Sequence, residues 1–584
     1  MRPRQRRRDN RPSQKTFYGL ELFRLRIMAT FGFMLLGFGL IGVRLLSVVL
    51  MQTAEPSSTY SASVRDSQPV RGRVLDAQGQ VMAASLKVKS LFADPHNIMD
   101  VDEVVRQLPK VLPSLSAEEL RRKLNKNRRF VWLKRQLTPT QVFAVNNLGL
   151  PGLGFRQEVQ RVYPQKEMAA HVVGSVNYRG AGVKGVEKSS QKKLAQGEDV
   201  HLTLDMRLQY ALHEDLTKAM QDSEAKAAWG VSLDAKSGQI KAMVSLPDYN
   251  ANHFGTAPKK AWLNRALDGV YEMGSVFKLF THATAIEHNN ISMAKLIDCT
   301  RPLEIGKFTI HDFVDRRAWL SAEDVFVHSS NIGAAQIGEM IGAERQQSTL
   351  ATLGLFDQFA SGLGRNAAPL APPPYKWGRI QTMSVSYGHG MAVTPLQMAA
   401  AARAVLVDGL WRQPVVTPAA TTMPSQKVFS KKTVAKMRKL AASVVSRGTG
   451  KKAAVNGYSI GGKTGTSEKN IGGQYMGDKN LASFVGVAPL NNPEIVTFIM
   501  VDEPQKGGGG AVAAPVFKAF TQKALAILNV PPDNKVPAFQ LDSPAGVDDK
   551  PSQAAKKVGR GVGRNVEPIE TSQHQPLALA YFNQ

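Results

Sequence analysis

Ser275 and Lys278 stand three residues apart in an apolar stretch and could act as a nucleophile and its base. The glycine before Ser275 predicts a turn that opens into a helix with the serine at its first position. Three helical residues then place Lys278 on the same face, one turn further on. The neighbouring side chains are apolar nearly all round, which predicts a buried helix. Because burial disfavours the ammonium form, Lys278 is expected to be a good proton acceptor.

The Ser-x-x-Lys spacing alone does not identify a nucleophile. The same spacing begins at four other serines, Ser189, Ser190, Ser223 and Ser292. Without further motifs, the simpler interpretation is that Ser275 caps a helix and that Lys278 extends into solvent. The order of the motifs that follow Ser275 is what favours this serine.

Two further motifs complete a set that suits acyl transfer. Ser329-Ser330-Asn331 begins 54 residues after Ser275, and Lys463–Thr466 begins 188 residues after it. Acyl transfer needs a hydroxyl that has lost its proton, so a buried amine beside Ser275 supplies general-base catalysis. Ser329 can relay the proton to the leaving amine, and Asn331 can orient the substrate peptide bond. The Lys463 ammonium adds positive charge toward a substrate carboxylate.

The third motif lies in a predicted strand that is rich in glycine. Gly461, Gly462 and Gly465 would let this strand approach another backbone closely. An extended peptide can therefore add to it as a further strand. Thr464, Gly465 and Thr466 are accordingly candidate substrate-binding residues, together with Asn331.

Composition indicates a folded protein of several domains with a strong positive charge. The 584 residues are 43% hydrophobic and 21% charged, and 74 Lys and Arg against 47 Asp and Glu give a net charge of +27. This charge favours anionic partners, such as nucleic acid, lipid head groups or an acidic polymer. The only cysteine, Cys299, excludes an intrachain disulfide and a cysteine-rich metal site. No metal and no cofactor is expected.

The amino-terminal segment predicts an uncleaved membrane anchor. Residues 1–26 form a tail with nine Arg or Lys, and residues 27–51 carry a single charge, Arg44. The apolar run is longer than a signal-peptide core, and no small-x-small cleavage site follows it. The positive-inside rule keeps the basic tail in the cytoplasm and places the chain from about residue 52 outside. The alternative is a buried helix of a soluble protein.

The pattern after the anchor predicts two folded parts and a tail. Residues 52–200 indicate an irregular α+β module, in which 117–126 is helical. Residues 201–530 indicate a larger domain in which an antiparallel sheet is covered by helices. Its expected strands are 229–233, 239–246, 457–463, 481–489 and 495–502, and its expected helices include 395–406 and 432–445. Residues 531–584 lack periodicity and predict a flexible tail. The fold class is therefore α+β.

The motifs, taken together, resemble those of the class B penicillin-binding proteins over residues 70–530. The resemblance also covers Arg71–Asp76, Arg161–Pro164, Gly185–Glu187, Ser386–Gly390, Val393–Gln397, Arg447–Gly450 and Val512–Phe517. It implies a pedestal domain at 52–200 and a penicillin-binding transpeptidase domain at 201–530. It also implies a serine acyl-enzyme formed on peptidoglycan stem peptides that end in D-Ala-D-Ala, with β-lactams as inhibitors. The Ser275 and Thr466 N–H groups would form the oxyanion hole.

Within this class, the chain looks most like the FtsI-type transpeptidases of cell division. That resemblance implies a single-pass protein of the cell inner membrane with its catalytic domain in the periplasm. It also implies an FtsW-type glycan polymerase and other division proteins as partners. Three features depart from the family pattern, namely Met273 in place of proline, Ala77-Gln78 in a turn, and Gly507–Gly510 in place of a segment with aromatics.

Three alternatives remain at this point. An elongation-type transpeptidase of the same class would share the catalytic residues and differ in partner and location. A β-lactam sensor or scaffold without transpeptidase activity would keep acylation, but no signalling domain is evident. A nucleic-acid binder has only the charge in its favour, including the basic cluster near Trp132. The predicted topology places its main domain on the wrong side of the membrane, so no nucleic acid is expected as a partner.

Overall fold

The computed structural model describes residues 14–52, 70–125, 127–288, 290–418, 425–471, 474–505 and 507–533. The chain divides into two units, Met1–Pro69 and Val70–Gln584. The basic tail up to residue 13 and the predicted flexible tail beyond residue 533 lie outside the described residues.

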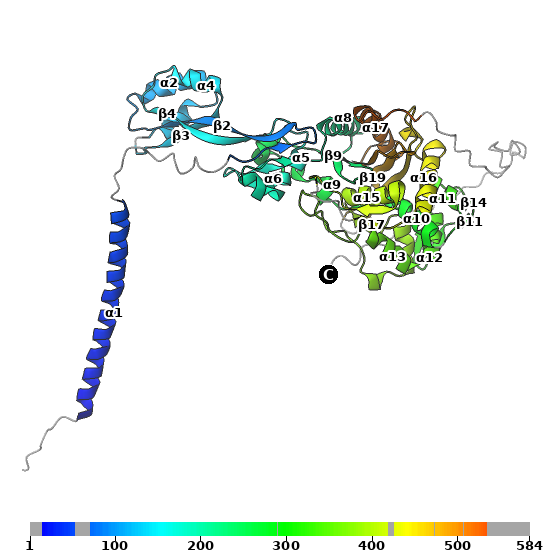
Figure 1. Cartoon of the computed structure of the whole chain (residues 1–584), viewed down its shortest axis with the longest axis horizontal. Helices are drawn as coiled ribbons and strands as arrows, with labels where there is room; N and C mark the ends of the chain where they lie inside the picture. Colours follow the sequence, from blue (N-terminus) through cyan, green and yellow to red (C-terminus); the bar gives the residue numbers. More distant parts are fainter. Residues whose placement is uncertain are drawn as a thin grey trace, which may run out of the picture. The chain divides into compact units, whose positions relative to one another are not determined.

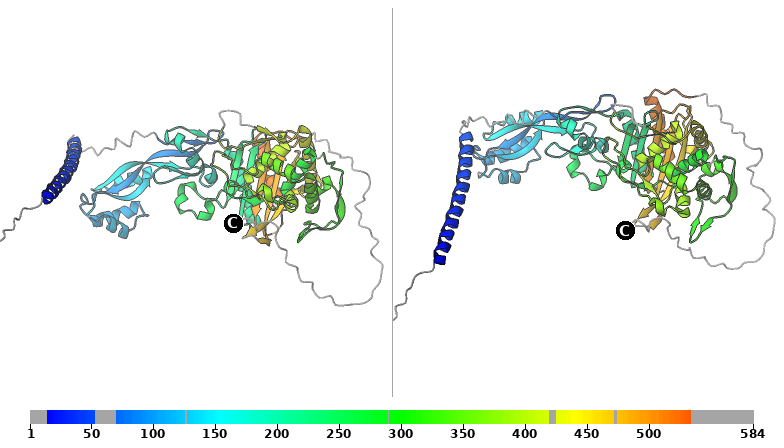
Figure 2. Two further views of the ribbon diagram at one scale, coloured as in Figure 1. Left: turned by 90° about the horizontal axis from the view of Figure 1, so that it is seen from below. Right: turned by 60° about the horizontal axis from the view of Figure 1, so that its bottom comes forward.

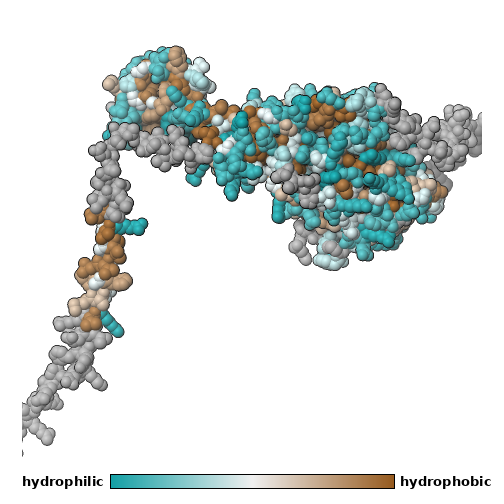
Figure 3. Space-filling view, viewed as in Figure 1, coloured by the Kyte–Doolittle hydropathy of each residue, from teal (hydrophilic) through white to brown (hydrophobic). Residues whose placement is uncertain are grey.

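In its described part, the first unit is one long helix, α1 (Gln14–Gln52). Its stretch Leu25–Leu46 has the length and composition of a membrane span, because 22 residues at 1.5 Å each extend about 33 Å. Large apolar side chains such as Phe33 are exposed along it, and they form the brown surface of this helix in Figure 3. The predicted anchor, 27–51, lies within α1. The helix begins earlier because residues 14–26 include many good helix formers, namely Leu, Glu, Gln, Lys and Arg.

The second unit begins with a sheet built on one long strand. The strands are β1 (Val74–Leu75), β2 (Val81–Ala93), β3 (Val131–Leu137), β4 (Leu153–Val162) and β7 (Val200–His201), in the order β3-β2-β1-β7 with β4 also on β2. The turn before β2 is closed by Asp76, whose carboxylate accepts hydrogen bonds from the N–H groups of Gln78 and Gln80. The strands β1 and β2 flank this turn, and β2 continues for 13 residues because β4 pairs with it along ten of them.

Short helices complete this first part of the unit. Figures 1 and 2 show α2 and α4 over one end of the β2–β4 ribbon, where Leu108, Leu120 and Leu133 are buried together. The helices are α2 (Val101–Val111), α3 (Ala117–Lys123), α4 (Pro139–Asn146), α5 (Ala170–Val173), α6 (Gly185–Ser189) and α7 (Gln191–Ala195), and the small hairpin is β5 (Ser175–Val176) with β6 (Gly182–Lys184). The predicted helix at 117–126 is therefore present but shorter.

A buried ion triad, formed by Arg71, Arg161 and Glu187, joins β4 to α6. The Glu187 carboxylate is fully buried and accepts hydrogen bonds from Arg71 and Arg161, both at 2.7 Å. Arg161 also donates to the Gly72 carbonyl at 2.8 Å. A carboxylate with two guanidinium partners avoids the penalty of an unpaired buried charge. The triad thus joins the start of the unit, β4 and α6.

The larger sheet has five strands, all antiparallel, in the order β18-β19-β20-β8-β9. They are β8 (Ala227–Asp234), β9 (Ile240–Leu246), β18 (Gly461–Ile471), β19 (Gln474–Ala488) and β20 (Ile495–Asp502). The predicted strands at 229–233, 239–246 and 495–502 are confirmed, and the first two form a hairpin. The strand predicted at 457–463 starts later, because Gly457 has φ +81° and the segment from 457 forms a turn.

Helices cover both faces of this sheet. On one face, α8 (Met206–Asp222) and α17 (Ala513–Ile527) bury Leu212 and Phe520 against strand residues such as Ile499. On the other face lie α10 (Lys278–His288), α15 (Pro395–Arg403) and α16 (Lys431–Ser446). Figures 1 and 2 show this arrangement of helix, sheet and helix. The predicted α+β fold, with an antiparallel sheet covered by helices, is confirmed.

A third layer of helices and small hairpins packs beside α10 around a further apolar core. Its helices include α11 (Ala322–Val327), α12 (Asn331–Ile341), α13 (Ala343–Thr352) and α14 (Arg379–Ser386), and α9 (Arg265–Asp268) precedes the serine turn. The two-stranded pairs are β10 (Tyr271–Glu272) with β15 (Ala392–Val393), β11 (Leu296–Cys299) with β14 (Ala318–Ser321), β12 (Leu303–Ile305) with β13 (Phe308–Ile310), and β16 (Leu410–Arg412) with β17 (Ser425–Lys427).

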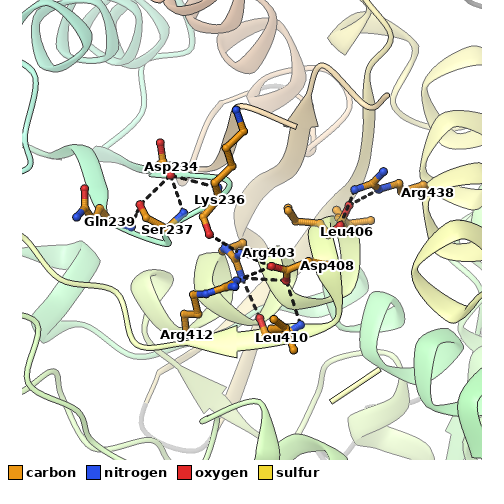
Figure 4. Close-up of polar contacts among 11 residues, drawn as sticks. Asp234, Lys236, Ser237, Gln239, Arg403, Leu406, Asp408, Leu410, Arg412 and Arg438 are labelled. Atoms are coloured by element: carbon orange, nitrogen blue, oxygen red, sulfur yellow. Dashed lines mark hydrogen bonds and ion pairs between the residues drawn. The ribbon is translucent and has the colours of Figure 1, made fainter. Parts of the chain in front are cut away.

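A buried arginine fixes the end of α15, as Figure 4 shows. The helix continues into a π-helical turn, Ala404–Asp408, and the Asp408 carboxylate accepts hydrogen bonds from Arg403 and Arg412. Arg403 also donates to the Lys236 carbonyl at 3.0 Å, in the turn between β8 and β9. Since a π-helical turn breaks the regular hydrogen-bond ladder, these contacts stabilise it. They join α15 to the sheet beneath it.

Candidate active site

Ser275 lies in a tight turn that glycine makes possible. The turn Gly274–Phe277 is a 3₁₀ helix, and α10 begins only at Lys278. The prediction that Ser275 opens an α-helix was therefore wrong in detail. Gly274 has φ +54°, and a Cβ there would lie 2.7 Å from the Thr466 carbonyl oxygen. Because side chains three residues apart eclipse in a 3₁₀ helix, the turn places Lys278 directly beside Ser275.

The buried Lys278 amine is the centre of a hydrogen-bond network. Its Nζ lies 2.7 Å from Ser275 Oγ and 2.7 Å from Asn331 Oδ1. It also lies 3.0 Å from the Ser329 carbonyl oxygen and 3.3 Å from Ser329 Oγ. Burial lowers the pKa of Lys278 to about 7, and the negative charge of Asp312 opposes this shift. The amine is therefore neutral in an appreciable fraction of molecules at neutral pH.

Ser329 is held in a strained backbone conformation. Its φ of +66° is uncommon for a residue with a side chain and costs about 1–2 kcal/mol. This conformation directs both its carbonyl oxygen and its hydroxyl toward Lys278. Such strain persists only where surrounding contacts fix it, and it is often found at functional sites.

Lys463 reaches the same hydroxyl from β18. Its Nζ donates to Ser329 Oγ at 2.9 Å and to the Thr464 carbonyl at 3.0 Å. Burial, and then the nearby Lys278, lower the pKa of Lys463 well below its usual value. The Phe326 ring lies beneath its ammonium, with the centroid 5.8 Å away. The two amines thus flank Ser329 Oγ, which suits a proton relay.

Thr464, Gly465 and Thr466 follow on the edge strand next to the serine turn. A Cβ on Gly465 would lie 2.4 Å from Ser483 Oγ and 2.9 Å from the Met273 carbonyl oxygen, so glycine is required there. Thr464 Oγ1 lies 2.6 Å from the Thr449 hydroxyl. Within the described residues β18 pairs only with β19, so no strand pairs with its other edge, where an extended peptide could add.

The glycine segment 507–510 lies against β18. The Gly509 N–H donates to Thr466 Oγ1 at 3.2 Å. A Cβ on Gly508 would lie 2.4 Å from that same oxygen, and a Cβ on Gly509 would lie 2.3 Å from the Gly465 carbonyl oxygen. The glycines at 507–510, which depart from the family pattern, therefore allow this segment to pack closely against β18.

Sequence reasoning missed a second network behind the serine turn. The Glu272 carboxylate accepts hydrogen bonds from the Tyr475 hydroxyl at 2.9 Å and from the Gly390 N–H at 3.1 Å. Burial raises the pKa of Glu272 to about 7. The Glu272 carbonyl accepts from Ser467 Oγ at 2.8 Å. Glu272 thus joins β18, β19 and the loop after α14 to the turn that holds Ser275. Its place three residues before Ser275 was the only signal for it.

Two of the other serines with the same spacing have hydroxyls that bond to main-chain carbonyls instead. Ser189 Oγ donates to the Gly362 carbonyl, and Ser223 Oγ donates to the Ala219 carbonyl. The structure therefore brings Ser275, Lys278, Ser329, Asn331 and Lys463 into one hydrogen-bond network, with 464–466 beside it. No group of three His, Cys, Asp or Glu side chains suited to a metal ion occurs among the described residues.

Two family models match the chain. The model described as penicillin binding protein transpeptidase domain matches residues 229–522. The model described as penicillin-binding protein dimerisation domain matches residues 66–203. The first match contains every candidate site residue, and the second contains the β2–β4 ribbon.

Relatives with similar sequences cover nearly the whole chain. A probable peptidoglycan D,D-transpeptidase FtsI of Caulobacter vibrioides is 35% identical over 532 residues, which are 87% of this chain and 89% of the relative. The peptidoglycan D,D-transpeptidase FtsI of Escherichia coli K12 is 31% identical over 81% of this chain and 86% of its own length.

Solved structures have the same fold. Penicillin binding protein 3 of Mycobacterium tuberculosis, solved in complex with aztreonam, matches with a TM-score of 0.65 and 25% identity. The match covers 80% of this chain and 97% of that one. It therefore extends across both parts of the second unit and beyond the catalytic motifs.

Proposed function

Because this chain belongs to the class B penicillin-binding proteins of the FtsI type and is a peptidoglycan D,D-transpeptidase, we propose that it cross-links septal stem peptides through an acyl-enzyme on Ser275. The observation that carries the site assignment is the 2.7 Å contact between Ser275 Oγ and the Nζ of Lys278, whose side chain is fully buried. Domain borders near residues 200 and 530 are part of the proposal.

In the first step, Ser275 Oγ attacks the carbonyl carbon of the penultimate D-Ala of a stem peptide. The neutral Lys278 amine takes the hydroxyl proton. The backbone N–H groups of Ser275 and Thr466 stabilise the oxyanion that forms. The tetrahedral intermediate then collapses and the bond to the terminal D-Ala breaks, as Ser329 gives its proton to the departing amine and receives the proton that Lys278 took from Ser275.

In the second step, an amine from another stem peptide attacks the ester carbonyl. It loses a proton to the same amine network, and Ser275 regains its own as the ester bond breaks. The new amide is the cross-link. Lys463 holds Ser329 in place for both transfers and attracts the substrate carboxylate, while Asn331, Thr464, Gly465 and Thr466 align the peptide on the edge of β18. A β-lactam forms the same ester with Ser275.

The apolar span and the family support the proposed location, a single pass through the inner membrane. The apolar stretch Leu25–Leu46 anchors the chain in the inner membrane, and the excess of basic residues before it favours a cytoplasmic amino terminus. The catalytic domain would then face the periplasm, where peptidoglycan is cross-linked. An FtsW-type glycan polymerase, which makes the strands, is the proposed membrane partner.

The test is to locate the covalent label left by a fluorescent penicillin. The purified protein is incubated with the penicillin, and its intact mass and peptide map are measured, with Ser275→Ala as the unlabelled control. We expect one adduct, on the peptide that contains Ser275, and release of D-Ala from a pentapeptide that ends in D-Ala-D-Ala. An adduct on Ser189, Ser190, Ser223 or Ser292 would contradict the site assignment.

The rate of acylation should rise with pH through about 7. Lys278 acts as a base only when it is neutral, and burial lowers its pKa to about 7. Below that pH the amine is protonated, so the second-order rate constant should fall about tenfold for each pH unit, and above about pH 8 it should level off. Stopped-flow mixing with a fluorescent penicillin from pH 5 to 9 measures this profile. A rate that stays constant from pH 5.5 to 8 would contradict the role of Lys278.

A further inference from the structure

The first residues of α12 are held by a carboxylate from a distant loop. Asp312 Oδ1 accepts hydrogen bonds from the N–H groups of Asn331 at 2.5 Å and of Ile332 at 2.9 Å. The helix already has its own cap, because Ser330 Oγ accepts from the Gly333 N–H at 2.9 Å. Asp312 therefore adds a second cap, from 19 residues earlier in the chain, at the residue that contacts Lys278.

The same loop also orients the Asn331 side chain. Asn331 Nδ2 donates to the His311 carbonyl at 3.0 Å, and Asn331 Oδ1 accepts from Lys278 Nζ at 2.7 Å. The His311 carbonyl can only accept, so it fixes which end of the amide faces the lysine. His311 and Asp312 thus hold both the main chain and the side chain of Asn331.

The charge of Asp312 also acts on the Lys278 amine. Burial is the main cause of the lowered Lys278 pKa, and Asp312 opposes it. The other titratable groups near this amine are Lys463 on β18, His282 on α10 and His389 after α14. Burial lowers the pKa of both histidines to about 4, so they are neutral at pH 7. Asp312 therefore supplies the negative charge at this side of the site.

We propose that Asp312 is a positioning residue for acyl transfer, because it holds Asn331 against the Lys278 amine and its negative charge acts on that amine. This inference rests on the proposed function of Lys278. The Asp312 carboxylate then has two effects: it aligns Asn331, and its charge acts on the Lys278 amine. Substitutions at position 312 separate the two effects. An alanine removes both effects, whereas an asparagine keeps an acceptor oxygen and removes the charge.

The loop offers a matched control three residues further on. The Asp315 carboxylate pairs with Arg317 at 2.8 Å, and both side chains are largely exposed. None of the contacts described for Asp315 involves α12 or Lys278. Asp315→Asn thus removes the same charge from the same loop without touching the site.

The experiment measures the second-order rate constant of acylation by a fluorescent penicillin from pH 5 to 9, and thermal unfolding, for the full-length wild type, Asp312→Ala, Asp312→Asn and Asp315→Asn. Asp312→Ala should lower the rate at pH 8 by about tenfold to 10²-fold, since small misplacements of catalytic groups have effects of this size. Asp312→Asn should recover part of this loss, and its acid limb should move to lower pH, because loss of the negative charge favours the neutral amine. Asp315→Asn should match the wild type.

Two results would overturn the inference. If Asp312 only caps α12, Asp312→Ala will melt at a lower temperature but be acylated at the wild-type rate, and the pH profile of Asp312→Asn will superimpose on that of the wild type. Should Asp312→Ala fail to fold, the acid limb of Asp312→Asn still decides the question. A wild-type protein that no penicillin acylates would instead refute the proposed function, and this inference with it.

Discussion

Lys278→Arg is expected to lose nearly all acylation by penicillins, although the positive charge is kept. A guanidinium remains protonated at any pH that the protein tolerates, so it cannot take the Ser275 proton. Loss of a general base lowers rates by about 10²–10⁴-fold. Arginine is also too large for a site in which Lys278 is fully buried between Ser275 and Asn331. The measurement is the rate of covalent labelling by a fluorescent penicillin at pH 8.

A second variant distinguishes the loss of acylation in Lys278→Arg from a failure to fold. A second variant, Lys278→Met, is neutral and close in size, so it should keep the melting temperature and also lose acylation. Both variants should therefore be inactive, and the methionine variant should be at least as stable as the wild type, because it removes a buried amine. Acylation by Lys278→Arg within about threefold of the wild-type rate would show that another group is the base.

The order of the motifs was enough to predict which residues come together. Ser275, Lys278, Ser329, Asn331 and Lys463 were expected at one site from their spacing and chemistry, and the structure places them in one network. Acyl transfer requires these residue types, and Ser275, Lys278 and Lys463 each have a glycine or apolar residues beside them that restrict their place. The hairpin of β8 and β9 was similarly predictable, because its turn residues and apolar runs are both local signals.

Other features depend on contacts between distant segments and left no local pattern. Asp312 belongs to a polar loop, and nothing in its neighbours indicates that its carboxylate caps α12. Glu272 carries no motif of its own, although burial raises its pKa to about 7. The β18 strand extends through the polar residues beyond Thr466 because β19 pairs with them, which apolar alternation cannot predict. Tertiary pairing decided the structure in each case.

A long-range contact between Gly388 and the serine turn gives a second prediction with a large expected effect on acylation. Gly388 follows α14 and touches the serine turn, and the Gly274 N–H donates to its carbonyl at 3.1 Å. Its φ is +91°, and a Cβ there would lie 1.9 Å from the Gly274 carbonyl oxygen. A side chain can therefore fit only if the turn before Ser275 moves. We expect Gly388→Ala to lower the rate of acylation by about 10²-fold or more, because displacements of about 1 Å have effects of that size.

Gly364→Ala is the matched control for this prediction. Gly364 also has a positive φ, +109°, but an added Cβ would have no heavy atom within 4 Å. The two substitutions thus impose a similar backbone strain, of about 1–2 kcal/mol, and only Gly388→Ala adds a clash at the serine turn. Gly364→Ala should lower the melting temperature slightly and keep acylation within about twofold of the wild type. Equal acylation rates for the two variants would mean that the Gly388 contact does not position Ser275, and that the loop after α14 can move without disturbing the nucleophile.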